Sequence, residues 1–172
     1  PKLMTFAITR PDSYRFAAGQ FSRLGFHEGE GFIWRAYSVV SAEYAETLEY
    51  FAVLIEDGPM SNKLATMQTG DKVLLDKTAT GFLLPERFPD GKDLIMLCTG
   101  SGIAPFLSVL QQPEIWQRFE RLVLVHSVSY ANELIFNQQI ADLKEHPLIE
   151  EYVDKLTFIP VTTREQTAGA LN

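Results

Sequence analysis

The sequence predicts a β plus α/β fold, in which an antiparallel β-barrel with a small capping helix precedes a partial parallel sheet. Up to about residue 84 the apolar residues form short β-rich runs broken by glycine, asparagine and aspartate, a pattern typical of an antiparallel barrel or sandwich. From residue 94 onward, continuous apolar runs alternate with helical stretches, which indicates parallel strands joined by right-handed crossovers. We therefore expect two domains, residues 1–90 and 91–172.

Short strands make up most of the first domain. Apolar runs bounded by turn residues place them at residues 4–9, 19–26, 32–40, 48–55 and 71–76. A helix interrupts them within residues 58–71, where Leu64 and Met67 share one face. Ser61 can cap the start of this helix and Gly70 can end it. We interpret it as the capping helix of the barrel.

A linker rich in proline, glycine and charge, residues 85–93, leads into the second domain. There we expect strands and helices in alternation, at residues 94–98, 104–112, 121–126, 131–146 and 155–161. This is half of a nucleotide-binding fold. The third strand has an open edge with only a loop after it, and no initiator methionine is present, so we expect a fragment truncated at both ends.

Composition and charge restrict the function classes. The 172 residues are 46% hydrophobic and contain no apolar run long enough to span a bilayer, so we expect a soluble protein with no membrane partner. We also expect a cytoplasmic monomer, and the single cysteine fits such a reducing compartment. The net charge is -7 and no lysine or arginine cluster is present, which argues against a nucleic-acid partner. The one cysteine, Cys98, ends an apolar strand and reads as a packed thiol, and no metal site is expected.

The stretch "CTGSGIAPF", residues 98–106, follows a buried strand and opens a helix. Backbone N–H groups and the helix dipole at such a turn can face a phosphate, and glycines allow a ligand to approach the backbone. The third glycine of the dinucleotide fingerprint is missing. Taken alone, the stretch fits a nucleotide site or an ordinary strand-to-helix turn equally well.

Two further stretches carry polar groups next to the core. Arg35 and Tyr37 share one face of an expected strand, and Ser38 points to the other face unless a bend re-aims it. An arginine fork and an aromatic plane suit a ligand with a phosphate and a flat ring, although a packed tyrosine and a surface arginine fit as well. Residues 58–61 can present helix-start N–H groups to a phosphate, or Ser61 can simply cap the helix.

The conjunction of these motifs is more specific than any one of them. In order and spacing, the chain resembles the ferredoxin–NADP reductase superfamily, and within it the bacterial ferredoxin/flavodoxin–NADP reductases. The matching stretches are "RAYSVVS", "LEYFAVLIEDGPMSNKL", "KTATGFLL", "LCTGSGIAPFLS" and "TTRE". The resemblance covers essentially the whole chain. It implies an FAD-binding barrel and an NAD(P)-binding α/β domain, with hydride passing from NADPH to FAD and single electrons leaving to ferredoxin or flavodoxin.

The resemblance also implies roles for individual residues. Arg35 would hold the flavin pyrophosphate, Tyr37 would stack on the isoalloxazine, and Ser38 would bond near its reactive N5, which makes Tyr37 and Ser38 the catalytic candidates. Further FAD contacts are implied at Phe51, Gly58, Pro59, Met60, Ser61 and Ser101. The NADP site is implied at Thr99, Gly100, Gly102, Ser129 and Arg164. Arginine and hydroxyl donors suit a diphosphate and the charge that changes at N5.

Ser129 departs from the family pattern, because bacterial members typically carry an arginine there. Arg164 matches another phosphate-binding arginine, so NADPH remains the favoured nucleotide. Ser129 supports an alternative, an NADH-preferring flavin or oxygenase reductase. A second alternative is not an enzyme: a flavin-binding electron-transfer subunit that does not react with nicotinamide. His126 is expected to be a hydrogen-bonded residue near the nucleotide crevice rather than a proton shuttle.

Overall fold

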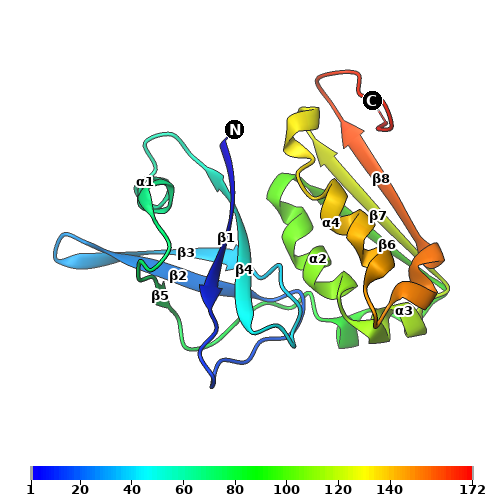
Figure 1. Ribbon diagram of the computed structural model, residues 1–172, viewed down its shortest axis with the longest axis horizontal. Helices are drawn as coiled ribbons and strands as arrows, with labels where there is room; N and C mark the ends of the chain where they lie inside the picture. Colours follow the sequence, from blue (N-terminus) through cyan, green and yellow to red (C-terminus); the bar gives the residue numbers. More distant parts are fainter. Residues whose placement is uncertain (1, 172) are drawn as a thin grey trace.

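The computed structural model describes residues 2–171, and Figure 1 shows a β part, from blue through cyan to green, beside an α/β part, from green to red. The expected order of an antiparallel barrel-like part followed by a parallel sheet is confirmed. The domain boundary at residues 90 and 91 stays a prediction. Within residues 2–171, no helix combines the length and the apolar character that crossing a membrane requires.

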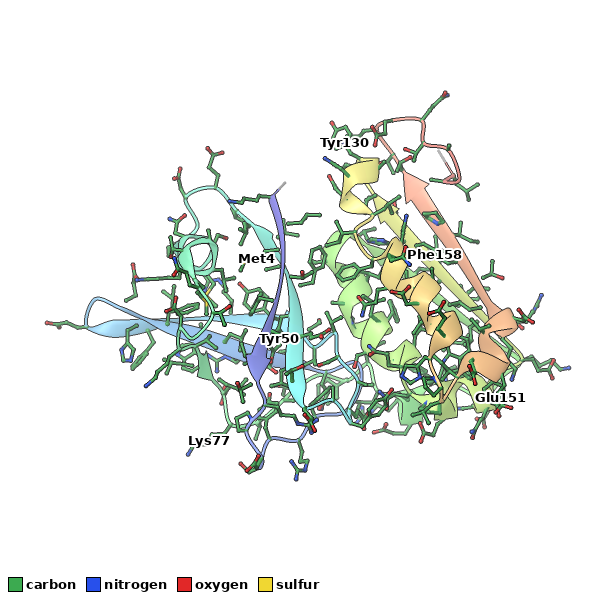
Figure 2. All side chains as sticks on the ribbon, viewed as in Figure 1. Met4, Tyr50, Lys77, Tyr130, Glu151 and Phe158 are labelled. Atoms are coloured by element: carbon green, nitrogen blue, oxygen red, sulfur yellow. The ribbon has the colours of Figure 1, made fainter. Side chains whose placement is uncertain are left out.

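Two antiparallel sheets form the β part. The strands are β1 (Lys2–Thr9), β2 (Phe21–Glu28), β3 (Gly31–Ser38), β4 (Thr47–Leu54) and β5 (Leu74–Leu75). β1 pairs with β4, and the other sheet has the order β3-β2-β5. Bridges Val39↔Tyr50 and Phe21↔Thr80 continue the pairing beyond the strands. Figure 2 labels Tyr50 inside this part, where it is 1% exposed and donates a hydrogen bond to Ser22 Oγ at 2.9 Å.

The capping helix α1 (Pro59–Thr66) is shorter than expected, and its start differs from the prediction. Gly58 occupies the N-cap position and Pro59 begins the helix. Ser61 is therefore not the cap; its Oγ instead accepts the N–H of Ile55 at 2.9 Å. The helix ends at Thr66 rather than at Gly70, and the strand expected over residues 71–76 pairs only at Leu74–Leu75.

A parallel sheet of order β6-β7-β8 forms the second part. Its strands are β6 (Asp93–Thr99), β7 (Arg121–Val128) and β8 (Leu156–Thr162), with helices α2 (Ala104–Leu110), α3 (Pro113–Arg118) and α4 (Asn137–Asp142). Short 3-10 helices are η1 (Pro85–Arg87), η2 (Gly100–Ile103), η3 (Ala131–Glu133), η4 (Leu143–Glu145) and η5 (Glu150–Lys155). In Figure 1, α2 and α4 lie on the face of the sheet toward the β part.

The long helix expected over residues 131–146 is wrong, because the segment divides into η3, α4 and η4. Leu134 and Phe136 are both buried although they lie two positions apart, and a single helix cannot turn both toward the same face. α3 was not predicted; Pro113 at its start fits the preference of proline for the first helical turn.

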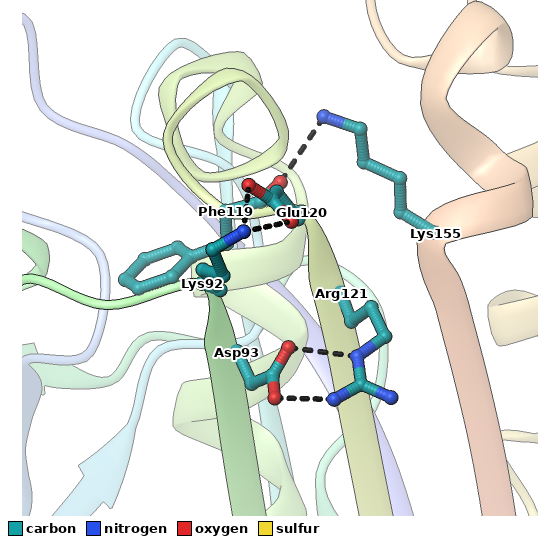
Figure 3. Close-up of polar contacts among 6 residues, drawn as sticks. All are labelled: Lys92, Asp93, Phe119, Glu120, Arg121 and Lys155. Atoms are coloured by element: carbon teal, nitrogen blue, oxygen red, sulfur yellow. Dashed lines mark hydrogen bonds and ion pairs between the residues drawn. The ribbon is translucent and has the colours of Figure 1, made fainter.

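Charged side chains form hydrogen bonds and ion pairs at the amino-terminal ends of the parallel strands, as Figure 3 shows. Arg121 binds Asp93 through two hydrogen bonds of 2.7 and 2.5 Å, so the first residues of β6 and β7 are joined side chain to side chain. Lys155 Nζ donates to the carbonyl oxygens of Trp116 and Phe119 at 2.6 and 3.1 Å. These contacts lie at the amino ends of the strands and leave the carboxyl ends free to form a site.

Buried contacts hold the two parts together. Phe51 of β4 meets Phe136 edge-on, with 4.9 Å between the ring centroids, and both belong to one continuous apolar core. Ser108 Oγ donates to the carbonyl oxygen of Ser41 at 2.8 Å, and Gln111 Nε2 donates to that of Val40 at 2.8 Å. Because these bonds run from α2 and the residue after it to the chain just after β3, they fix the relative position of the surfaces that form the site.

Candidate functional site

A cavity of about 380 Å³ lies where the β part meets the α/β part. Four chain segments line it: the end of β3, the middle of β4, the turn into α1 and the start of the second part. The nine residues expected to contact FAD all line this cavity: Arg35, Tyr37, Ser38, Phe51, Gly58, Pro59, Met60, Ser61 and Ser101. Their individual roles stay predictions, but the fold brings these residues, which are far apart in the sequence, to one cavity.

The end of β3 explains why three different polar groups meet on one side. Simple alternation would send Ser38 away from Arg35 and Tyr37, yet all three line the cavity. At this point the chain leaves the pairing with β2: Ser38 still pairs with Phe21, whereas Val39 bridges to Tyr50 of β4. The strand thus turns a corner between the two sheets directly after Ser38, where simple alternation along one strand no longer applies.

Tyr37 is half-buried and keeps its phenol neutral. Its ring meets Phe6 edge-on at 6.2 Å between centroids. Burial raises the pKa of Tyr37, and the nearby Arg35 only partly opposes this rise. The exposed Arg35 guanidinium donates one bond to the carbonyl oxygen of Trp34 at 2.8 Å. The remaining N–H groups of this side chain can therefore serve an anion.

The turn into α1 has the shape of a preformed anion site. Asp57 has a φ of 57°, and the Gly58 N–H donates to the Ile55 carbonyl oxygen at 3.1 Å. A side chain at Gly58 would place its Cβ 3.2 Å from both the Ile55 carbonyl oxygen and Ser61 Oγ, so the tight turn favours glycine. The first N–H groups of α1 have no acceptor within the helix, and the helix dipole makes this end attractive to a phosphate.

The turn after β6 carries Thr99, Gly100 and Gly102 at the carboxyl edge of the parallel sheet. Thr99 is the last residue of β6, and the two glycines belong to η2. Gly100 has a φ of 48°, in the left-handed region. Its carbonyl oxygen lies 2.9 Å from Nε2 of the buried His126. Burial lowers the pKa of His126, so the neutral ring donates its Nε2–H to this carbonyl and fixes the turn.

Ser129 and Arg164 are neighbours at the same edge. The N–H of Arg164 donates to the Ser129 carbonyl oxygen at 3.0 Å, which brings together the ends of β7 and β8. Ser129 is half-buried and Arg164 is exposed. Sequence reasoning missed the two carboxylates beside them, Glu133 and Glu165. The resemblance included Glu165 in "TTRE" but gave it no role, and Glu133 lies outside the matching stretches; the significance of both comes from which backbone N–H groups they face.

Cys98 is a packed thiol, as expected. Its Sγ lies 3.3 Å from the Val125 carbonyl oxygen, and burial raises its pKa to about 11. A thiol with such a pKa is not a thiolate at neutral pH. Among residues 2–171, no group of three or more His, Cys, Asp or Glu side chains is arranged to hold a metal ion.

Comparison with known proteins gives a consistent set of relatives. The model of the family "Oxidoreductase NAD-binding domain" matches residues 96–170. Ferredoxin–NADP reductase of Azotobacter vinelandii is 39% identical over 165 residues, which cover 95% of this chain and 64% of the relative. Flavodoxin/ferredoxin–NADP reductase of Rhodobacter capsulatus is 36% identical over 167 residues, covering 95% and 62%. The chain thus spans less than two thirds of the length of these curated relatives.

Solved structures agree with this result. A ferredoxin NADP+ reductase from Neisseria gonorrhoeae, with bound FAD and NADP, superposes with a TM-score of 0.90 at 70% identity, covering 99% of this chain and 66% of that one. The ferredoxin-NADP+ reductase from Plasmodium falciparum, with 2'P-AMP, superposes with a TM-score of 0.75 over 98% of this chain and 67% of that one. At 15% identity, the second likeness shows the shared fold alone.

Proposed function

Because the chain belongs to the ferredoxin–NADP reductase superfamily, we propose that it takes part in FAD-dependent electron transfer between NADPH and ferredoxin or flavodoxin. One observation carries this proposal: a single cavity gathers an arginine, a tyrosine, a serine and a helix start from separate chain segments. A ligand with a diphosphate and a flat ring needs this combination of groups.

The cavity residues fit FAD group by group. The exposed Arg35 has N–H groups for two parallel bonds to the diphosphate, and the start of α1 adds backbone N–H groups of Met60 and Ser61. Ser61 already accepts the Ile55 N–H, so its own O–H remains available to donate to a phosphate oxygen. The Tyr37 ring offers an aromatic plane to the isoalloxazine, and the Ser38 hydroxyl lines the same cavity as a donor for the ring's edge.

When bound, FAD supplies the conversion between two-electron chemistry with the nicotinamide and one-electron chemistry with the protein carrier. The chain's own residues bind and orient the reactants. Ser101 and Ala104 line the cavity, so a nicotinamide held at the Thr99–Gly102 turn would lie beside a flavin bound there. His126 keeps this turn in place through the Gly100 carbonyl oxygen, and it needs no change of protonation to do so.

Ser129 favours a second candidate function, an NADH-preferring flavin or oxygenase reductase. A serine there offers no positive charge to a 2'-phosphate, so Arg164 must supply the attraction. The structural relative with bound NADP is 70% identical to this chain, which supports NADPH as the first candidate. A flavin-binding electron-transfer subunit without nicotinamide reactivity is the non-enzymatic alternative.

The proposal extends to partners and location. We infer that an acidic ferredoxin or flavodoxin docks on the flavin side, that the protein acts as a cytoplasmic monomer, and that residues 1–90 and 91–172 form the FAD and nucleotide domains. Residues up to Lys92 carry a charge of -2 of the total of -7, from 10 basic and 12 acidic residues, so this part repels an acidic carrier less than the rest.

Anaerobic stopped-flow bleaching of the visible flavin band tests the function in the FAD-loaded protein as its gene encodes it. Much faster bleaching with NADPH than with NADH at equal concentration is the expected result. Equal or faster bleaching with NADH would establish the second candidate. A protein that retains FAD but bleaches with neither nucleotide would be an electron-transfer subunit, and one that binds no FAD would contradict all three.

A further inference from the structure

Backbone hydrogen bonds between β7 and β8 continue into the loops that follow the two strands. The ladder between the two strands continues past their ends, because the N–H of Thr163 donates to the Val128 carbonyl oxygen and that of Arg164 donates to Ser129, each at 3.0 Å. The backbone of Arg164 is therefore placed beside Ser129. These bonds do not fix the direction of the Arg164 side chain or the shape of the loops around it.

Beyond Arg164 the two segments that follow β7 and β8 diverge, and the Glu165 side chain connects them. Ala131 begins η3, while the other segment turns back until the Leu171 N–H donates to the Pro160 carbonyl oxygen at 2.9 Å. Glu165 Oε1 accepts the N–H of Ala131 across this gap. The first N–H of a helix lacks an acceptor within the helix, so a carboxylate from the neighbouring loop is a favourable partner.

Glu133 holds the same loop from its other end. Its Oε2 accepts the N–H of Ser129 at 3.2 Å, which closes residues 129–133 into a turn. Its Oε1 is buried and makes no hydrogen bond within residues 2–171. Both glutamates therefore direct an oxygen at backbone N–H groups of the loop that contains Ser129, one from inside the loop and one from outside.

Two carboxylates beside an expected phosphate site are unfavourable by charge alone, because they repel the phosphate. In parallel α/β nucleotide sites, an acidic side chain near this edge can instead accept a bond from a free ribose 2'-hydroxyl. Here Glu133 and Glu165 each use an oxygen on the backbone, while the side chain of Arg164 is exposed and makes no ion pair within residues 2–171. Arg164 is thus an exposed cation at this edge with no carboxylate paired to it among the described residues, which suits a phosphate.

We propose that Glu165 is a positioning residue for the 2'-phosphate of the nucleotide, which acts by holding loop 129–133 against the loop that carries Arg164. The inference rests on the proposed function, since it assumes that this edge binds the adenosine half of NADPH. It assigns to Glu165 a role in discriminating a 2'-phosphate from a 2'-hydroxyl, even though the carboxylate itself is an anion.

Calorimetric titration of the FAD-loaded protein with two nucleotide fragments tests this role without any catalytic turnover. Adenosine 2',5'-bisphosphate carries the 2'-phosphate, and AMP with a free 2'-hydroxyl lacks it. In Glu165→Ala we expect the Kd of the bisphosphate to rise about tenfold, because the charge-assisted contact between Arg164 and the 2'-phosphate is then misplaced. The Kd of AMP should change less than about twofold, because AMP does not make this contact. Glu165→Gln keeps an acceptor oxygen and should remain close to wild type.

Glu86→Ala is the matched control, because Glu86 is an exposed carboxylate at the start of η1. It should leave both Kd values unchanged. Tighter bisphosphate binding in Glu165→Ala would mean that the carboxylate mainly repels the phosphate, and would overturn the inference. Equal losses for both fragments, or a loss in Glu165→Gln as large as in Glu165→Ala, would overturn it too.

The wild-type titration separates this inference from the proposed function. If the wild-type protein binds the bisphosphate more tightly than AMP and Glu165→Ala keeps that preference, only the role of Glu165 is wrong. If the wild-type protein binds neither fragment, the nucleotide half of the proposed function fails, and the role of Glu165 fails with it.

Discussion

Tyr37 combines two properties that matter for a flavin site. Its ring is held by edge-on contact with Phe6, and burial raises the pKa of its hydroxyl, so the group remains a neutral phenol throughout the neutral pH range. A held, uncharged aromatic plane can cover a flavin ring without competing for its polar edge.

Replacing Tyr37 separates the ring from the hydroxyl. Tyr37→Ser removes the aromatic plane, and we expect the Kd for FAD to rise about twofold to twelvefold, since an aromatic pair contributes about 0.5–1.5 kcal/mol beyond area burial. Tyr37→Phe keeps the plane and should bind FAD like the wild type. Flavin fluorescence titration of the apoprotein measures both values, and a loss as large in Tyr37→Phe would show that the hydroxyl is the more important contact.

Sequence reasoning singled out Arg35 and Tyr37 as candidates because an arginine fork and an aromatic plane suit a phosphate and a flat ring, and the roles that the resemblance gave them stay predictions. Arg35 and Tyr37 are an arginine and an aromatic residue in a strand, and both line the cavity. It left the direction of Ser38 open, because alternation along a strand does not reveal a corner between two sheets. It gave Glu165 no role although "TTRE" ends at this residue, because an exposed glutamate in a loop is ordinary until its backbone partner, Ala131, is known.

At the scale of elements, the strands were predicted more accurately than the helices. A strand here needs only a short apolar run, so β6, β7 and β8 lie within a few residues of their expected positions. Helices depended on tertiary contacts: residues 131–146 divide because Leu134 and Phe136 are both drawn into the core, and α1 starts at Pro59 because the preceding turn is closed by Gly58.

The turn between β6 and α2 provides a prediction about an element boundary. Gly100 has a left-handed φ of 48°, and a methyl group added to its Cα would meet no atom within 4 Å, so Gly100→Ala suffers only backbone strain. We expect it to lower the free energy of unfolding by about 1–2 kcal/mol. Gly102→Ala is the matched control: its Cβ would lie 3.7 Å from Cys98 Cβ, an ordinary contact, and its φ is not left-handed. Urea unfolding compares the two, and equal losses would contradict the strain argument.

At the scale of the whole molecule, the site exists because two differently built parts share one core. The cavity takes its walls from β3, β4 and α1 on one side and from Ser101 and Ala104 on the other. The apolar core that contains Val40 and Phe51 of the first part also contains most of the buried residues of the second. The angle between the parts is thus set by side chains that belong to one continuous buried core.

This shared core predicts that the chain unfolds in one cooperative transition. In a Trp34→Phe background, Trp116 fluorescence reports the second part while far-UV circular dichroism reports the whole chain, and we expect the two urea midpoints to coincide. Phe136→Ala removes the 4%-exposed ring that packs on Phe51, which should cost about 3–5 kcal/mol and separate the midpoints.

Ile135→Ala controls for this change, because Ile135 precedes Phe136 in the same segment but is 41% exposed. It should cost less than about 1 kcal/mol and leave the midpoints together, since partly exposed side chains contribute less on burial. Midpoints that differ already in the Trp34→Phe background would show that the two parts fold independently. The shape of the cavity would then depend on the bound cofactor rather than on the shared core. If the two parts unfold independently, the packing between them is too weak to fix the angle at which they meet.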